Sequence, residues 1–267
     1  MRITYVGTAS VLLEYAGLRI ITDPVFDEPG QTYSMAPSPI PAAWFASTRT
    51  YSSPITVQNL GAIDVALISH DHHSDNLDAA GRALVLSDRV AAVVTNPAAA
   101  HRLSRERENV LGLWPGSTIE FGAVSITATP ARHGPTLTPQ ASEVTGFLLE
   151  AESEPSVWIS GDTVLTREVR DWAERNRGVG VAIINAGGVR FPAAPLLGRV
   201  LFTFDPPQFR EVADLLEPRV IVPVHRSGWS HFQPEDALRA ALADLGKRVR
   251  WLDPGQSTEI QATGIDA

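Results

Sequence analysis

Short apolar runs alternate with amphipathic stretches along most of the chain. Runs at 3–6, 10–15 and 18–22 are separated by turn residues, which predicts an opening β-meander. Further strands are predicted at 64–69, 90–95, 118–121, 123–129, 144–151, 156–160, 180–185, 219–224 and 248–252, and helices at 77–88, 97–107, 166–177, 206–217 and 234–245. The pattern predicts an α/β fold.

Residues 25–60 interrupt this alternation. The segment is rich in Pro, Ser and Thr, carries Trp44, Phe45 and Tyr51, and shows no clear periodicity. A loop this long in a compact chain is usually functional, so we interpret it as the wall of a pocket, with a poorly ordered loop as the alternative. Since no repeat or linker divides the sequence, we expect one domain over 1–267.

Composition narrows the classes of function. The formal net charge is -8 and no run rich in Lys or Arg appears, so nucleic acid is not an expected partner. The chain has no cysteine, and a bound metal would need nitrogen and oxygen ligands. The first residues lack a signal-peptide pattern, and no apolar stretch approaches the roughly 20 residues of a membrane span. We expect a soluble cytoplasmic protein that acts on a small molecule. Whether it forms a homo-oligomer is left open by the sequence.

The most informative cluster lies at residues 69–76, directly after the apolar run 65–68. Three imidazoles (His70, His72 and His73) and the carboxylates of Asp71 and Asp75 share one turn. Crowding these groups costs free energy unless a cation lies among them, so the cluster indicates a metal site. The alternative is a solvated turn in which an aspartate caps the next helix.

Other potential ligands follow predicted strands. His70, His133, Asp162 and His225 each come at or shortly after the end of one. Because strand ends in packed α/β folds converge on one rim, these four groups could gather there. Taken singly, each histidine could instead be a hydrogen-bonded loop residue, and Asp162 a helix cap.

Several motifs together resemble a known family. They are Gly7-Thr8-Ala9-Ser10, Thr22-Asp23-Pro24, the cluster at 69–76, Thr129-Pro130-Ala131-Arg132-His133, Ser160-Gly161-Asp162-Thr163, Asn185-Ala186-Gly187-Gly188 and Pro223-Val224-His225. In this order they resemble the metallo-β-lactamase-fold hydrolases, particularly the branch of L-ascorbate-6-phosphate lactonase and N-acyl-phosphatidylethanolamine phospholipase D. The resemblance implies an αβ/βα four-layer sandwich of two mixed sheets flanked by helices, with a metal site along the edge between the sheets.

The chain departs from the family pattern His-x-His-x-Asp-His. An ungapped reading from His70 loses both the aspartate and the last histidine, whereas one extra residue aligns His73, Asp75 and Asn76 with the pattern. We prefer the second register because it replaces only the final histidine.

The resemblance then implies a ligand for each position of a binuclear site. His70, His73 and His133 would bind the first metal, Asp75 and His225 the second, and Asp162 would bridge them. Asn76 would stand where an imidazole normally completes the second position, and an amide oxygen is a weaker ligand for borderline metals. We therefore expect one or two ions, Zn²⁺ or Mn²⁺, with the second held weakly. His72 could compensate or point to solvent.

A metal can activate water without a serine or cysteine nucleophile. We therefore expect a metal-dependent hydrolase acting on an ester, lactone or phosphoester. Asp75 would orient or deprotonate the water, and His231 would donate a proton to the leaving group, unless His231 is simply a hydrogen-bonded loop residue.

Two other functions stay open. The first is a phosphodiesterase acting on a phospholipid or a nucleotide-type substrate, for which cations would hold the flanking phosphate. The candidates are Arg132, Arg190, Arg199 and Arg226. The second is a metal-binding scaffold without catalysis, which the departure at 74–76 suggests.

Overall fold

The computed structural model describes residues 1–36, 41–135, 139–194 and 197–261. Its strands are β1 Arg2–Gly7, β2 Ser10–Tyr15, β3 Leu18–Thr22, β4 Thr32–Ser34, β5 Ala46–Thr48, β6 Ile63–Ile68, β7 Val90–Thr95, β8 Val110–Gly112, β9 Thr118–Phe121, β10 Val124–Thr129, β11 Gly146–Ala151, β12 Glu154–Ile159, β13 Val181–Asn185, β14 Val220–Val224 and β15 Ser257–Glu259. The helices are α1 Ala79–Val85, α2 Pro97–Leu103, α3 Arg167–Arg175, α4 Pro206–Leu216 and α5 Glu235–Ala241, with 3₁₀ turns at Ala42–Phe45, Val57–Leu60, Pro139–Ser142 and Ala243–Arg248.

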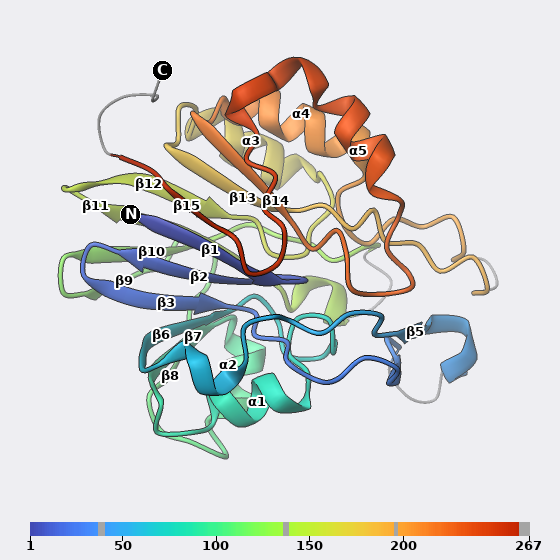
Figure 1. Ribbon diagram of the computed structural model, residues 1–267, viewed down its shortest axis with the longest axis horizontal. Helices are drawn as coiled ribbons and strands as arrows, with labels where there is room; N and C mark the ends of the chain where they lie inside the picture. The colour runs from blue at the N-terminus through green and yellow to red at the C-terminus, as the bar shows by residue number, and fades with distance from the viewer. Residues whose placement is uncertain (37–40, 136–138, 195–196, 262–267) are drawn as a thin grey trace.

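Two mixed sheets form the centre of the molecule (Figure 1). The first has the strand order β15-β1-β2-β3-β6-β7-β8, and the second the order β14-β13-β12-β11-β10-β9. The strands β1, β2 and β3 pair antiparallel, as the opening meander predicts. Parallel pairs are β3 with β6, β6 with β7 and β7 with β8 in the first sheet, and β12 with β13 and β13 with β14 in the second.

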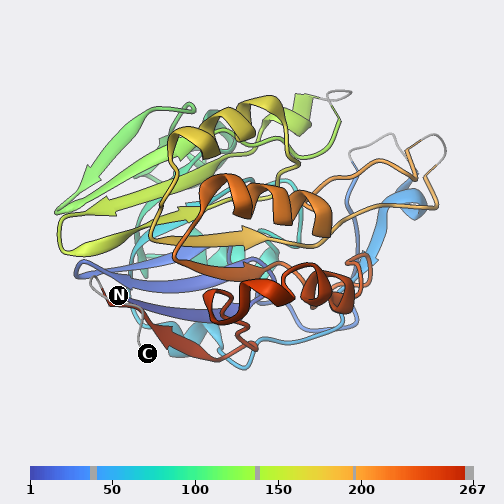
Figure 2. The ribbon, with the colours of Figure 1, turned by 90° about the horizontal axis from the view of Figure 1, so that it is seen from above.

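Alternating side chains give each sheet two apolar faces. One set of strand residues, such as Leu13, Val65, Phe147 and Ile183, packs between the sheets. The opposite face of the second sheet packs against α3, α4 and α5, which cross it in Figure 2, and the outer face of the first sheet packs against α1. The four-layer αβ/βα sandwich expected from the sequence is therefore confirmed.

Helix starts follow capping side chains. Asp78 accepts a hydrogen bond from the backbone N–H of Gly81 at 2.7 Å, so α1 begins at Ala79 rather than at the predicted residue 77. Asn96 caps α2 in the same way, with Pro97 in the first turn where its missing N–H costs nothing.

One predicted strand was wrong, and several short strands were not predicted. The predicted strand at 248–252 makes only an isolated bridge between Val249 and Ile221, and the strand near this end of the chain is β15, paired with β1. The edge strand β8 was not predicted, because three residues carry too little periodicity. The segment 25–60 contains the β4–β5 hairpin, whose strands are equally short.

Candidate metal centre

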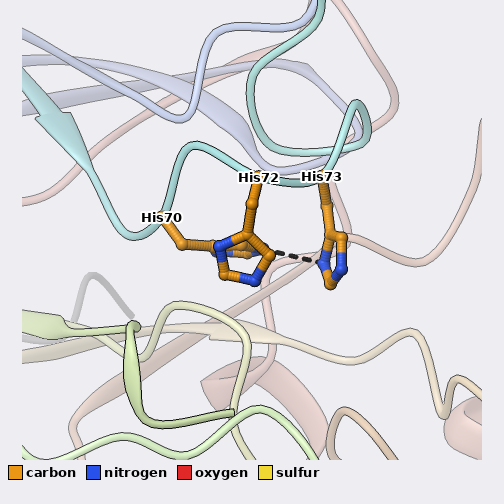
Figure 3. A group of neighbouring side chains, drawn as sticks. All are labelled: His70, His72 and His73. Atoms are coloured by element: carbon orange, nitrogen blue, oxygen red, sulfur yellow. Dashed lines mark hydrogen bonds between the residues drawn. The ribbon is translucent and has the colours of Figure 1, made fainter. Parts of the chain in front are cut away.

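Four histidines converge beside the end of β6. His70 and His73 come from the turn after that strand, and the Nδ1 atom of His73 lies 3.2 Å from His70 Nε2. The same Nδ1 lies 2.9 Å from Nε2 of His133, which follows β10. The three imidazoles of the turn, including His72, leave the backbone on the same side (Figure 3). The structure thus places His73, rather than His72, against His133.

Neighbouring groups fix the tautomers of two of these rings. Ser69 Oγ donates to Asp23 at 2.8 Å, so its contact of 2.9 Å with His70 is an acceptance from Nδ1–H. His133 donates Nδ1–H to the carbonyl oxygen of Phe202 at 2.8 Å. Both rings therefore present the lone pair of Nε2 to the cluster, as metal-ligating histidines do.

Burial keeps the histidine cluster neutral. The pKa values of His70 and His73 lie well below the ordinary value because burial disfavours the charged ring and neighbouring imidazoles add to the effect. Burial also lowers the pKa of His72, to about 4. At neutral pH, His70, His72 and His73 therefore offer uncharged nitrogen donors, which is the state that binds a metal.

The second cluster contains two carboxylates. Asp75 lies in the turn after β6, Asp162 after β12 and His225 after β14, and one ligand atom from each lies within 4.8 Å of the others. The Nε2 atom of His225 is 3.2 Å from Asp75, and its Nδ1 atom is 3.4 Å from Asp162. Asn185, at the end of β13, donates to Asp162 at 2.7 Å. The four strand ends expected to converge do so.

The carboxylates and histidines of this cluster shift one another's pKa values toward the charged forms. Burial opposes ionisation of Asp75, but hydrogen bonds from His225 and His231 outweigh it and hold the pKa of Asp75 well below its usual range. Burial also disfavours a charged His225, yet the nearby Asp162 and Asp75 raise its pKa. The same two carboxylates would favour a metal cation at this position.

Asn76 is buried beside these groups. Its amide nitrogen donates to Asp23 at 3.2 Å, and its Oδ1 atom has no partner among the described residues. Asp23 also accepts from the backbone N–H of Ser69 at 2.7 Å. Asp23 and His225 both have positive φ, at 33° and 54°, which is uncommon for such residues and is found where a site constrains the backbone.

His231 contacts the same oxygen of Asp75 as His225 does. Its Nε2 atom is 3.1 Å from Asp75, and its Nδ1 atom is hydrogen-bonded to the buried Ser47 in β5. Its ring stacks on Phe191, with the centroids 5.3 Å apart. Residue-by-residue reading of the sequence gave no role to Ser47, Asp23 or Asn185. Asp23 and Asn185 lie at the ends of predicted strands, and this position is a signal that the sequence offers. Ser47 lies among many serines and threonines, so the sequence gives no signal for it.

A pocket of about 310 Å³ opens onto both clusters. Five polar residues of the centre, His72, His73, Asp75, His133 and His231, form its floor. The walls are mainly apolar, and the residues that form them are Met35, Ala36, Phe45, Pro135, Ala141, Val189, Phe191, Leu197 and Phe202. Met35, Ala36 and Phe45 come from the segment 25–60.

The cation nearest the floor is already paired. Arg102 on α2 is the one Arg or Lys among the described residues that line the pocket. It binds Asp71 through two nitrogens, at 2.9 and 2.6 Å, and Glu143 at 2.8 Å. The group therefore carries no net positive charge toward the pocket.

The four arginines that the sequence suggested for phosphate binding lie elsewhere, and none is among the described lining residues. Arg226 is buried and binds Glu235 and the carbonyl oxygen of Leu252. Arg190 pairs with Asp205 at 2.9 Å. Arg132 lies 3.8 Å from Glu168, and Arg199 is exposed.

No helix within the described part of the chain is long and apolar enough to cross a membrane.

Comparison with known proteins agrees with this architecture. Residues 18–252 match the family described as the β-lactamase superfamily domain. A UPF0173 metal-dependent hydrolase of Opitutus terrae is 26% identical over 268 residues, which cover 97% of this chain and 100% of that protein. Another, from Methanopyrus kandleri, is 25% identical over 269 residues, with the same shares covered.

A solved structure shares the fold at lower identity. The isothiocyanate hydrolase from Delia radicum gut bacteria superposes with a TM-score of 0.81 at 20% identity, covering 98% of this chain and 100% of that one. The family match spans most of the sequence and includes the strands that carry the metal centre. The chain therefore belongs to the metallo-β-lactamase superfamily, as a metal-dependent hydrolase.

Proposed function

We propose that the protein hydrolyses a small, uncharged and largely apolar ester or lactone. The observation that carries this proposal is the pocket, whose apolar walls lead to a floor of metal-ligating side-chain types. An apolar substrate gains free energy by leaving water for such walls, roughly 25 cal/mol for each Å² buried. Only the type of bond, a lactone, agrees with the lactonase of the branch that the sequence resembles, because that enzyme's substrate carries a phosphate group.

The residues present fit a binuclear metal centre. Asp75 Oδ1 and Asp162 Oδ2 are buried without a hydrogen-bond partner among the described residues, and the two ring nitrogens of His225 face these two carboxylates at 3.2 and 3.4 Å. Such groups are costly to bury unless a ligand satisfies them. His70, His73 and His133 would hold one ion, Asp75 and His225 the other, and Asp162 both.

Zn²⁺ and Mn²⁺ are the ions that we favour for these nitrogen and oxygen donors. When bound, they would polarise the scissile carbonyl group and activate water for attack.

The protein's own side chains would then orient and exclude water. Asp75 has one oxygen held between His225 and His231, which leaves Oδ1 to accept a hydrogen bond from the attacking water. His231 lies on the pocket floor with Nε2 directed at Asp75, where it can pass a proton to a leaving group. Phe191, which stacks on the His231 ring, would limit the access of water to it.

Charge argues against a phosphodiester substrate. A flanking phosphate needs cations, and Arg102 is neutralised by Asp71 and Glu143. A scaffold without catalysis is disfavoured by membership among metal-dependent hydrolases and by a donor set that retains both carboxylates and His225.

Hydrolysis assays on matched substrates test the proposal. The metal-loaded protein should hydrolyse p-nitrophenyl butyrate and γ-lactones with short alkyl chains far faster than bis(p-nitrophenyl) phosphate. Asp162→Ala should lower that activity by about a thousandfold, and Asp171→Ala, at an aspartate on the exposed face of α3, serves as the control. Equal rates on esters and phosphodiesters would contradict the substrate class, and full activity of Asp162→Ala would contradict the site.

A further inference from the structure

His72 has no role in the ligand set described above, yet it lies among the ligands. Its ring centroid is 4.6 Å from that of His70 and 4.4 Å from that of His73. All three side chains extend to the same side of the turn (Figure 3). A solvent-facing ring, one of the two outcomes that the sequence left open, is therefore not what the structure shows.

Both ring nitrogens of His72 are buried and have no hydrogen-bond partner among the described residues. An imidazole always has one N–H and one lone pair, or two N–H groups, and burying them unpaired costs free energy. The nearby charged groups do not satisfy them, because Asp71 and Glu143 are occupied by Arg102. A bound ligand would satisfy these unpaired nitrogens.

The spacing of the ring nitrogens in this turn indicates a metal ion as that ligand. One nitrogen from each of His70, His72 and His73 lies within 4.8 Å of the others, a spacing that a single metal ion can bridge after small side-chain rotations. His72 is not grouped in this way with Asp75, Asp162 and His225, so it does not replace the imidazole missing at Asn76. Its partners are the other two histidines of its own turn.

We propose that His72 is an additional nitrogen ligand, and that His70, His72 and His73 hold a borderline divalent ion such as Zn²⁺ or Co²⁺. This inference rests on the proposed metal-dependent function but concerns only how the ion is held. The extra residue in the turn at 70–76 thus adds a donor. A position built of imidazoles favours Zn²⁺ and Co²⁺, whereas the carboxylates of Asp75 and Asp162 suit a harder ion such as Mn²⁺.

Metal titration of the full-length, metal-free protein tests this assignment. We expect His72→Ala to weaken the tightest Zn²⁺ and Co²⁺ binding by about 10- to 100-fold, measured by competition with a chromophoric chelator. The visible spectrum of bound Co²⁺ should also change, because the number of nitrogen ligands changes. Binding of Mn²⁺ should stay within about twofold of wild type.

Two further variants make the test specific. His72→Gln keeps a polar side chain of similar length and should show the same loss, which separates ligation from a packing defect. His101→Ala removes an exposed imidazole on α2, bonded to Arg105, and should bind metal like the wild type. Unchanged Co²⁺ affinity and spectrum in both His72 variants would overturn the inference.

Failure of this inference and failure of the proposed function give different results. Wild-type protein that needs His72 for tight Co²⁺ binding but hydrolyses neither esters nor lactones contradicts the substrate class alone. Protein that hydrolyses them, with His72 variants that bind Co²⁺ unchanged, contradicts the role of His72 alone.

Discussion

The two sides of the candidate metal centre differ in charge and in origin. On the histidine side, burial keeps His70, His72 and His73 neutral, and all three come from one short turn. On the aspartate side, Asp75 and Asp162 flank His225, and the three residues follow three different strands. One side offers uncharged nitrogen, and the other offers anionic oxygen.

This difference indicates how each side depends on the fold. The histidine side needs mainly a correctly shaped turn, because His70, His72 and His73 are close in sequence and only His133 follows a distant strand, β10. The aspartate side exists only when the turn after β6 of the first sheet meets the ends of β12 and β14 of the second sheet, and its buried charges are costly until a cation joins them. We therefore expect perturbations of the aspartate side to have the larger consequences.

Removing the shared carboxylate should have the largest effect. Asp162→Ala should lower kcat by about a thousandfold, because several kcal/mol of transition-state stabilisation depend on the metals that this residue would hold. His133→Ala should lower it less, since other imidazoles remain on its side. The variants are compared by steady-state kinetics with metal content measured in parallel. A greater loss in His133→Ala would reverse the ranking of the two sides.

Metal removal should destabilise the protein strongly. Returning Zn²⁺ to chelator-treated protein, at 100 to 1,000 times its dissociation constant, should add about 3 to 4 kcal/mol to the free energy of unfolding. For a chain of this length the melting temperature should rise by roughly 10 °C. Thermal unfolding followed by circular dichroism measures this shift. The shift should shrink in Asp162→Ala, and one of undiminished size would place the stabilising ion away from the aspartate side.

An imidazole at position 76 should strengthen metal binding on the aspartate side. Asn76→His should tighten binding of the second equivalent of Zn²⁺ by about tenfold, because an imidazole is a better ligand than an amide for this ion. The cost is the hydrogen bond to Asp23 and a larger ring in a buried position, about 1 to 3 kcal/mol of stability. Isothermal titration calorimetry gives the affinity, with exposed Asn59→His as control. Weaker binding of the second ion would show that the amide oxygen is the preferred donor.

Loosening His231 should have the smallest effect. Ser47→Ala removes the hydrogen bond to Nδ1, which is worth about 1 kcal/mol, so kcat should fall by about fivefold while KM stays nearly constant. Ser47→Thr retains the hydroxyl and should recover most of the rate, and Ser34→Ala, at an exposed residue of β4, should have none of the effect. A rise in KM alone would mean that Ser47 shapes the pocket and does not position His231.

The sequence predicted those elements whose hydrophobic pattern is visible within a short stretch of residues. The strands that became β6, β10, β12 and β14 were evident as apolar runs, and the histidine, aspartate or loop after each was visible as chemistry. The edge strands β4, β5 and β8 were missed, because three residues pair only when tertiary contacts hold them together. The same contacts bring Ser47 to His231 across 184 residues of sequence.

The sequence by itself determined the α/β class, the superfamily and the residue types that could bind metal. Hydrophobic periodicity and the crowding of ionisable groups are properties of short stretches of sequence, so they can be recognised without the structure. Only the tertiary structure decided that His73 faces His133, that His72 joins its own turn and not the aspartate side, and that the four candidate arginines are not among the described residues that line the pocket. The physical reason is that one extra residue in a turn redirects each side chain after it. Where those side chains finally point is set by packing against β10, β12 and β14, which are distant in sequence.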